Sequence, residues 1–524
     1  MDLDSVKIKT ALISVSDKAG LDTLALALQK LGVEIISSSG TAAFLKSKGI
    51  TIVDASKVTG FPEILAGRVK TLHPKIFGAL LSKEGDDSDD RDLLENGIGR
   101  IDLAIVNLYP FEKTVADGKA TLEDAVENID IGGPSLLRAA AKNYSRVAAV
   151  CDPSDYPSLI SELEKNSGAL SCATRKALAA KVFQHTLQYD AVISSYLSAQ
   201  FSGETFGSSM GLALSKVQDL RYGENPHQKA ALYAFRSPEG ELLQKRKQLW
   251  GKELSYNNIT DVDAAVGLAL EFSGQNAAII IKHSNPCGVA IGASNFEAFT
   301  TALSTDPISA FGGVICFNNP VTLAEASKIA TMFCEIIIGP SFEPDAFEAL
   351  KAKKNLRIIE EPTLAGATAK SGLDMRSVRG GLLVQERDEA LFSAEKKVVT
   401  KRAPTDQELS DIDFAWKVCK HVKSNAVVYV KGNRTIGVGA GQMSRVDSAK
   451  IAAMKASASK LDTNGCVMAS DAFFPFRDGV DEAAKAGITA IVQPGGSIRD
   501  NEVITAADEK NIAMVFTAIR HTWH

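Results

Sequence analysis

The stretch TALISVSDKAG at residues 10–20, followed by LDTLALALQKLG at 21–32, decides the fold of the first part of the chain. An apolar run of strand length ends in a glycine-containing turn, and a segment with helical spacing of its apolar residues follows. The pattern returns further along, at VEIISSSGT (33–41) with AAFLKSKG (42–49), IDLAIVNLYP (101–110) and RVAAVCDP (146–153). Apolar strands that alternate with helices predict an α/β domain whose parallel sheet is covered on both faces.

The rest of the 524 residues predicts further globular units. Residues 154–200 carry helical spacing with few breakers, which predicts a helical extension of the first domain, and FSGETFGSSMG (201–211) is typical of a linker. From 212 to 524 strands and helices alternate again, with a further division expected near residue 395. Both halves of this region place a strand, a polar turn and a helix in the same order, so duplicated α/β layers are expected.

The composition excludes several classes of protein. Apolar residues make up 45% and charged residues 23%, as in ordinary folded proteins rather than disordered or collagenous chains. A net charge of −5 provides no general positive field for DNA, RNA or anionic lipid, so neither nucleic acid nor a membrane is an expected partner. Seven cysteines without a C-x-x-C pair, and an N-terminus without an apolar leader, favour a cytoplasmic location.

Three turns of the first domain are candidate phosphate sites. SVSDK (14–18) and SSSGT (37–41) each follow an apolar strand, and Ile131–Ser135 opens the helical segment LLRAAAKN. Helix N-termini present unpaired N–H groups and a positive dipole end to anions. The alternative for any one of these turns is a serine or threonine that only caps its helix.

The segment GRVKTLHP (67–74) is too polar for the core of a strand. Arg68 could donate hydrogen bonds from two N–H groups to a phosphate, and Lys70 could act as a positive charge or as an acid. The alternative is a solvated basic turn. The sequence alone leaves both interpretations open.

Polar residues also stand beside two apolar stretches of the first domain. Asn107 and Tyr109 come at the end of the strand IDLAIVNLYP, so an amide and a phenol are expected at the same edge of the sheet. Asp130 lies between apolar residues in NIDIGG, where a lone carboxylate needs a partner. Lys142 is a candidate for that partner.

In the second region, Lys282 and His283 directly follow the strand AAIII at 277–281. A lysine beside a histidine at the end of a strand suits proton transfer, although single histidines are more often structural. Asn285–Gly288 resembles half of a zinc-deaminase signature, but Ala290 stands where the second cysteine would be needed, so no zinc is expected.

Two further clusters in this region are candidates for contacts with a ligand. RYGENPHQ (221–228) concentrates polar groups that could hold a phosphate and an amide-bearing ring. Phe473, in DAFFPFRD (471–478), belongs either to the core or to a surface that stacks on a flat heterocycle.

Together these motifs resemble the bifunctional purine-biosynthesis family that joins IMP cyclohydrolase to AICAR (phosphoribosylaminoimidazole carboxamide) formyltransferase. The resemblance covers nearly the whole chain, and its motifs occur in the family's order: SVSDK, GRVKTLHP, NLYPF, IDIGG, RAAAKN, RYGENPHQ, KHSNPCG, GAGQMSR and SDAFFPFRD. It implies a methylglyoxal-synthase-like cyclohydrolase domain at 1–200. It also implies a duplicated, metal-free cytidine-deaminase-like α/β/α formyltransferase domain at 212–524.

The resemblance implies two consecutive reactions. A formyl group passes from 10-formyltetrahydrofolate to the amine of AICAR, and formyl-AICAR then closes to IMP with loss of water. The residues matched to ring closure are Lys70, Tyr109, Asp130 and Lys142, and the sequence does not say which is acid and which is base. Those matched to contacts with the nucleotide are Ser16, Lys18, Ser38, Gly40, Thr41, Arg68, Thr71, Asn107, Gly132 and Gly133. One departure is Ser39, where many relatives carry glycine.

For formyl transfer the resemblance implies that Lys282 and His283 are catalytic and that Asn425 holds the formyl oxygen. A base is required because the aromatic amine donates its lone pair into the ring. The matched nucleotide contacts are Arg221, Tyr222, Gly312, Glu335, Arg445, Phe473 and Arg520, with aspartate replacing Glu335 in some relatives. The matched folate contacts are Asp478, Ser497 and Ile498.

The resemblance also implies a homodimer whose formyltransferase sites are shared between subunits, with a monovalent cation, potassium, near them. Two alternatives compete with the enzyme. A nucleotide sensor without chemistry predicts changed residues at Lys70, Lys142, Lys282 or His283, and all four have the types that catalysis needs. The net negative charge of the chain argues against a nucleic-acid-binding protein.

Overall fold

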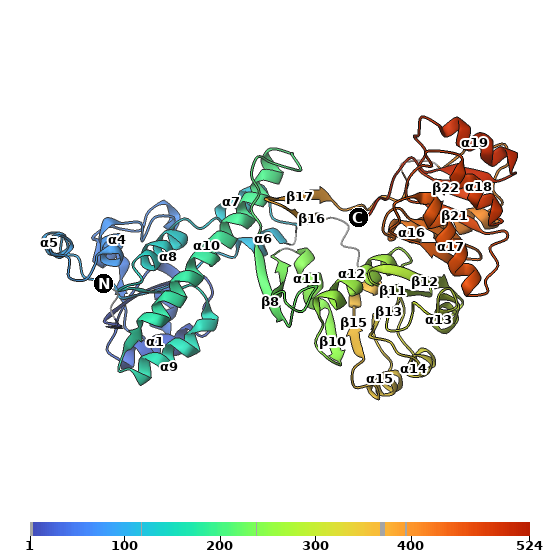
Figure 1. The fold of residues 1–524 in the computed structure, drawn as a ribbon. Coiled ribbons are helices and arrows are strands. Elements are labelled where there is room, and N and C mark those ends of the chain that lie inside the picture. The colour runs from blue at the N-terminus through green and yellow to red at the C-terminus, as the bar shows by residue number, and fades with distance from the viewer. Residues whose placement is uncertain (1–3, 117, 237, 367–371, 393–395) are drawn as a thin grey trace. The chain divides into compact units, whose positions relative to one another are not determined.

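The computed structural model describes residues 4–116, 118–236, 238–366, 372–392 and 396–524 (Figure 1). The chain forms two compact units, Met1–Ser215 with Phe235–Pro238, and Lys216–Ala234 with Glu239–His524. The expected linker at 201–211 lies near the end of the first unit. Residue 395, near which a further division was expected, lies outside the described residues.

The first unit alternates strands and helices over most of its length (Figure 1). Its elements are β1 Ser5–Lys7, β2 Thr10–Val15, α1 Leu21–Lys30, β3 Glu34–Ser37, α2 Ser39–Ser47, β4 Val53–Asp54, α3 Ala55–Thr59, α4 Pro74–Leu81, α5 Asp87–Glu95, β5 Leu103–Asn107, α6 Phe111–Ala116, α7 Leu122–Glu127, α8 Gly132–Lys142, β6 Ala148–Val150, α9 Tyr156–Lys165, β7 Ala169–Ser171 and α10 Cys172–Phe201.

The sheet of this unit has the strand order β4-β3-β2-β5-β6, and every neighbouring pair is parallel. Alternate residues of β2 enter two different cores: Ala11 and Ile13 pack with α1 and α9, whereas Leu12 packs with α4, α8 and α10. The expected parallel sheet with both faces covered is therefore confirmed. The expected helical extension is interrupted by β7, which pairs with β1.

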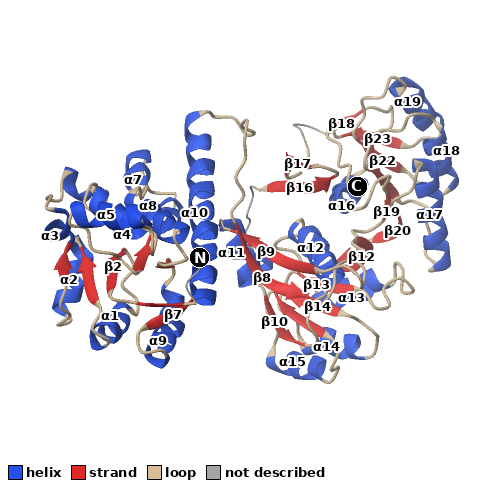
Figure 2. Cartoon of the chain, turned by 60° about the vertical axis from the view of Figure 1, so that its left-hand side comes forward, coloured by secondary structure: helices blue, strands red, loops and turns tan. Residues whose placement is uncertain are grey.

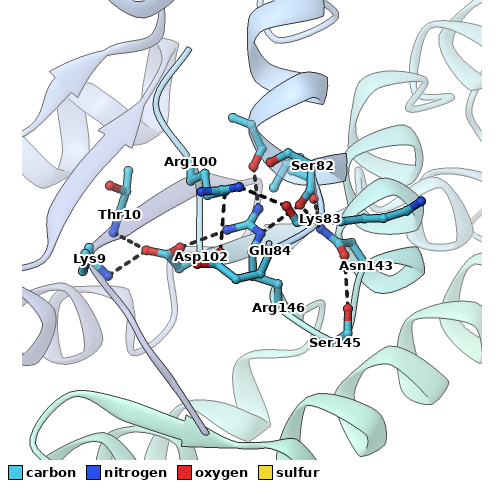
Figure 3. Close-up of polar contacts among 12 residues, drawn as sticks. Lys9, Thr10, Ser82, Lys83, Glu84, Arg100, Asp102, Asn143, Ser145 and Arg146 are labelled. Atoms are coloured by element: carbon cyan, nitrogen blue, oxygen red, sulfur yellow. Dashed lines mark hydrogen bonds and ion pairs between the residues drawn. The ribbon is translucent and has the colours of Figure 1, made fainter. Parts of the chain in front are cut away.

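A buried ion pair holds the amino-terminal edge of this sheet (Figure 3). Arg146 is 1% exposed, and its Nη1 atom lies 3.0 Å from Oδ1 of Asp102. The other carboxylate oxygen accepts the backbone N–H groups of Lys9 and Thr10 at 2.8 and 3.1 Å, and Arg146 also donates to the carbonyl of Ser82 at 3.0 Å. Since both charges are paired and bonded, they can be buried here without a large penalty.

The second unit is longer and contains two six-stranded sheets (Figure 2). Its elements are β8 Leu214–Leu220, β9 Ala230–Phe235, α11 Pro238–Lys245, β10 Lys247–Trp250, α12 Tyr256–Leu270, β11 Ala277–Lys282, β12 Asn285–Ile291, α13 Asn295–Leu303, β13 Val314–Phe317, α14 Leu323–Ala330, β14 Ile336–Gly339, α15 Pro344–Lys351, β15 Arg357–Glu360, β16 Leu373–Val378, β17 Gly381–Glu386, β18 Lys397–Val398, α16 Asp406–Lys420, β19 Val427–Val430, β20 Thr435–Gly439, α17 Arg445–Ala458, β21 Val467–Ser470, α18 Asp478–Lys485, β22 Ala490–Gln493, α19 Asp500–Glu509 and β23 Ala513–Phe516.

The two large sheets of this unit repeat one topology. Their strand orders are β10-β15-β14-β13-β11-β12 and β18-β23-β22-β21-β19-β20, with the same sequence of parallel and antiparallel pairs. Helices α12 and α16 contribute to one core shared by both copies, in which the rings of Phe272 and Phe414 lie 5.1 Å apart. The copies also meet at β12 and β20, where the N–H of Ile291 donates to the carbonyl of Asn433 at 3.1 Å. The expected duplication of α/β layers is therefore present.

Candidate active sites

A cavity of about 720 Å³ opens at the carboxyl ends of β2, β3 and β5 in the first unit. Ligands of parallel α/β sheets bind at this edge, where strands lead into helix N-termini. Thirteen of the fourteen residues expected at the cyclohydrolase site line the cavity, namely Ser16, Lys18, Ser38, Gly40, Thr41, Arg68, Lys70, Thr71, Asn107, Tyr109, Asp130, Gly132 and Gly133.

Asn107, the last residue of β5, fixes the turn that follows β2. Its Oδ1 atom accepts the N–H groups of Ser16 and Asp17 at 2.6 and 2.9 Å, and its Nδ2 atom donates to the carbonyl of Asp17 at 3.1 Å. Thr41 donates to the carbonyl of Val15 at 3.0 Å. These bonds tie the ends of three adjacent strands, β3, β2 and β5, together, so the polar turns form one wall of the cavity.

Ser38 provides a polar group that the protein itself leaves unsatisfied. It is the N-cap residue of α2, but its side chain accepts no capping hydrogen bond, so the interpretation as a simple helix cap is wrong here. Its buried Oγ atom has no partner among the described residues. A buried hydroxyl at a helix N-terminus favours an anionic ligand. The neighbouring Ser39 has a φ of 47°, a conformation that favours glycine, and its hydroxyl donates to Glu63 at 2.7 Å.

Asp130 is the candidate base of this cavity. Burial raises its pKa, and the N–H of Gly133 and the charge of Lys70 only partly offset that rise. The Gly133 N–H donates to Oδ1 of Asp130 at 2.7 Å. Lys142, the partner suggested by the sequence, is exposed at the far end of α8, about 15 Å along the helix axis from Gly132. The expected pairing of Asp130 with Lys142 is therefore wrong within this chain.

Tyr189 was not identified from the sequence, although it positions Asp130. Its hydroxyl oxygen accepts the Asp130 N–H at 2.8 Å and donates to the carbonyl of Asn128 at 3.2 Å. Tyr189 lies on α10, so the helical extension supports the loop that carries the carboxylate. Nothing in the local sequence around Tyr189 signals this contact, because 59 residues separate the two partners.

Charged residues face one another across the same cavity. Burial lowers the pKa of Lys18; the negative charge of Asp17 opposes this shift, and the positive charge of Lys70 adds to it. Arg68 donates two hydrogen bonds of 3.0 Å to Glu127. Lysines that lie close enough to depress a pKa form a local positive field, which an anionic ligand would neutralise.

Lys282 and His283 lie in the first copy of the second unit, in the hairpin between β11 and β12. The ammonium group of Lys282 donates to the carbonyls of Gly312 at 3.0 Å and Phe311 at 3.2 Å. Gly312 has a φ of 68°, and a Cβ there would lie 3.0 Å from the ring of Phe333, so this position requires glycine. A pocket of about 290 Å³ is lined by both candidate catalytic residues.

Glu335 directly precedes β14, the strand next to β13, at the same edge of the sheet. Its carboxylate lies 3.3 Å from Nη1 of Arg357 and accepts from Asn258 at 3.3 Å. Burial lowers the pKa of Arg357, and its titratable neighbours include Glu335, Arg221 and Tyr222. The guanidinium of Arg221 lies 5.7 Å from the centre of the Tyr222 ring. The fold thus groups Arg221, Tyr222, Gly312 and Glu335 near Lys282, at the amino ends of β13 and β14.

The second copy gathers its candidates at the opposite edge of its sheet. Asn425 precedes β19 and donates to the carbonyl of Gln442 at 2.7 Å. Arg445 lies 3.3 Å from the fully buried Asp471, and its Nε atom is buried without a partner among the described residues. Arg520 stacks on Phe473 at 4.5 Å.

The remaining candidates follow the carboxyl ends of β21 and β22. Asp478 begins α18, and the turn at Ser497 is held by Asp500, which accepts the Ser497 N–H at 3.1 Å. Ile498 is fully exposed. The two copies also contact each other near two of the catalytic candidates. The N–H of Lys423, two residues before Asn425, donates at 3.0 Å to the side chain of Asn285, two residues after His283.

The profiles of two known families match the sequence. The profile of the AICARFT/IMPCHase bienzyme family matches residues 140–455, and that of the MGS-like domain matches residues 20–135. The chain belongs to the AICARFT/IMPCHase bienzyme family. It is a bifunctional enzyme of purine biosynthesis with formyltransferase and IMP cyclohydrolase activities, and the family uses 10-formyltetrahydrofolate as the formyl donor.

One solved structure similar to this bienzyme is titled "Crystal structure of ForH". It shares 34% sequence identity over 37% of this chain and 98% of its own, with a TM-score of 0.35.

Two negative findings apply to the described residues. No helix among them is long and apolar enough to cross a membrane. No three or more His, Cys, Asp or Glu side chains among them are grouped so that they could hold a metal ion.

Proposed function

We propose that the cavity of the first unit closes formyl-AICAR to IMP and that residues 1–200 form the cyclohydrolase domain. The observation that carries this proposal is that one cavity collects thirteen residues drawn from five separate segments of the chain. The unpaired Ser38 hydroxyl and the positive field of Lys18 and Lys70 support a phosphate at the start of α2.

In this proposal Asp130 accepts the proton that the carboxamide nitrogen loses as it attacks the formyl carbon. A raised pKa makes a carboxylate a stronger base than an exposed one. Lys70, whose charge acts on Asp130, stabilises the oxyanion that develops on the formyl oxygen, and Tyr109 shares the cavity wall. The formyl oxygen takes that proton and a second one from the formamide nitrogen, and it leaves as water while the double bond between that nitrogen and the formyl carbon forms. Lys142 lies outside this cavity, and its role rests on the resemblance alone.

We propose that residues 212–524 perform formyl transfer. His283 accepts the proton of the AICAR amine as the amine attacks the formyl carbon, Lys282 lies beside it, and Asn425 holds the formyl oxygen. The bond from the formyl carbon to N10 of the folate then breaks, and N10 takes up a proton to leave as tetrahydrofolate. The nucleotide contacts proposed are Arg221, Tyr222, Gly312, Glu335, Arg445, Phe473 and Arg520, and the folate contacts are Asp478, Ser497 and Ile498. The unpaired Nε of Arg445 and the exposed side chain of Ile498 support binding surfaces there.

Three further proposals rest on the resemblance alone. They are a homodimer with formyltransferase sites shared between subunits, a monovalent cation such as potassium near those sites, and a cytoplasmic location. No residues are assigned to the cation.

Two variants separate the two activities. His283→Ala should abolish formyl transfer while purified formyl-AICAR still cyclises, and Lys70→Ala should have the reverse effect. Lys57→Ala, on α3 and outside the cavity, is the matched lysine control and should leave both rates unchanged. Wild-type cyclisation in Lys70→Ala would refute the assignment of the first cavity, and formyl transfer that survives in His283→Ala would refute that of the second unit.

A further inference from the structure

Because the second unit is duplicated, the hairpin that carries Lys282 and His283 can be compared with the equivalent hairpin of the second copy. Gly288 and Gly437 occupy equivalent positions, since a Cβ on either would lie 2.1 Å from a helix carbonyl, that of Ala302 or of Ala452. Counting back six residues from each glycine places the turn Lys282–Asn285 in register with Lys431–Arg434.

The helices that precede these hairpins in the chain, α12 and α16, carry two aspartates at equivalent positions. Ser255 caps α12 and Thr405 caps α16, each with a capping box. Asp261 and Asp411 stand six residues after their respective caps. The two carboxylates therefore occupy the same place in the two copies.

Both aspartates hold the tip of their hairpin through its backbone. Oδ1 of Asp261 accepts the N–H of Ser284 at 2.7 Å. Asp411 accepts the N–H of Asn433 at 2.8 Å and that of Gly432 at 3.1 Å. Both copies thus use an aspartate side chain that accepts backbone N–H groups of the turn, but the turn residues differ between the copies.

The turns differ in how much support their residues need. In the second copy the left-handed positions are Gly432 at φ 64° and Asn433 at φ 55°, residue types that adopt this conformation readily. In the first copy the same positions are His283 at φ 51° and Ser284 at φ 59°. Histidine adopts this conformation more often than most residue types but serine does so rarely, and two non-glycine residues in succession persist there only where the surroundings enforce the turn.

We propose that Asp261 is a positioning residue for formyl transfer, whose carboxylate holds the Lys282–Asn285 turn in the left-handed conformation that presents His283 to the substrate. This inference rests on the proposed role of His283. The carboxylate also lies close to the side chains of Lys282 and His283. In the second copy, Asp411 holds the equivalent turn through the same kind of hydrogen bond. Gly432 and Asn433 adopt that turn readily, and no catalytic residue is proposed there.

The test compares matched variants in the full-length enzyme. Asp261→Asn keeps an oxygen acceptor but loses the charge, so kcat for formyl transfer should fall about tenfold, with KM for AICAR changed less than about threefold. Asp261→Ala should lose about a hundredfold. Asp411→Asn, the equivalent change in the other copy, should keep kcat within about twofold while lowering the unfolding midpoint.

A rescue distinguishes positioning from a general loss of structure. Ser284→Gly in the Asp261→Ala background supplies a residue that accepts positive φ unaided and should recover at least about threefold of the lost kcat. Wild-type kcat in Asp261→Asn, equal losses in Asp261→Asn and Asp411→Asn, or no recovery with Ser284→Gly would each overturn the inference. If Asp261→Ala does not fold, the two asparagine variants decide the matter. His283→Ala, measured alongside, distinguishes a failure of this inference from a failure of the proposed function. If His283→Ala keeps formyl transfer, the proposed function itself is wrong.

Discussion

Replacing Gly133 by alanine tests how tightly the cyclohydrolase cavity fixes Asp130. A Cβ at Gly133 would lie 2.5 Å from Oδ2 of Asp130 and 2.8 Å from Cδ2 of Leu108. Leu108 is buried in the core, whereas Asp130 borders the cavity and has room to move. The added methyl group should therefore act mainly on the carboxylate.

The size of the effect follows from these distances. Since Cβ contacts under 3.0 Å essentially never occur, Oδ2 must shift by at least half an ångström. That shift disrupts the 2.7 Å bond from the Gly133 N–H to Oδ1. A hydrogen bond to a charged group contributes about 1.5–3 kcal/mol, and misplacing a catalytic group by about 1 Å costs about a hundredfold in rate. We expect cyclisation to fall by about a hundredfold and the free energy of unfolding by about 1–3 kcal/mol.

The assay follows the conversion of purified formyl-AICAR to IMP by absorbance, with urea denaturation in parallel. Formyl transfer by the same protein is the internal control and should remain at the wild-type rate. Gly78→Ala on α4 is the matched glycine control, because its Cβ would meet only the flexible end of Ile98, at 3.3 Å. Wild-type cyclisation in folded Gly133→Ala would show that the position of Asp130 is not critical and would refute the proposed base.

Three further variants probe the first unit. Tyr189→Phe removes the acceptor of the Asp130 N–H and should slow cyclisation about tenfold without affecting formyl transfer; an unchanged cyclisation rate would exclude α10 from the site. Because burial raises the pKa of Asp130, ionisation destabilises the folded state as the pH rises from the unfolded value of about 3.9 through the folded one. Asp130→Asn should therefore match the wild type in stability at the acid end of that window and exceed it above, and equal stability at neutral pH would contradict the raised pKa. Asp102→Asn leaves Arg146 buried without its counter-charge and should cost about 3–5 kcal/mol in urea denaturation, so a loss under about 1 kcal/mol would refute the role of this pair (Figure 3).

Much of the architecture follows from local sequence alone. The apolar runs that became β2, β3, β5 and β6 are continuous because both faces of their sheet are buried, and that pattern is visible without coordinates. Turns that end such strands must lie at the same edge of a parallel sheet. For that reason the polar residues near Ser16, Ser38 and Asn107 could be expected at one site before the cavity was seen.

The sequence alone also determined the residue types that the chemistry needs, because the motifs carry them in a fixed order. The tertiary structure decided which groups touch. It separated Lys142 from Asp130, brought the Tyr189 hydroxyl to the backbone N–H of Asp130 from 59 residues away, and placed Asp261 against the hairpin of His283. Hydrogen bonds act over about 3 Å, and the folded path of the chain, rather than spacing along it, sets which atoms come that close.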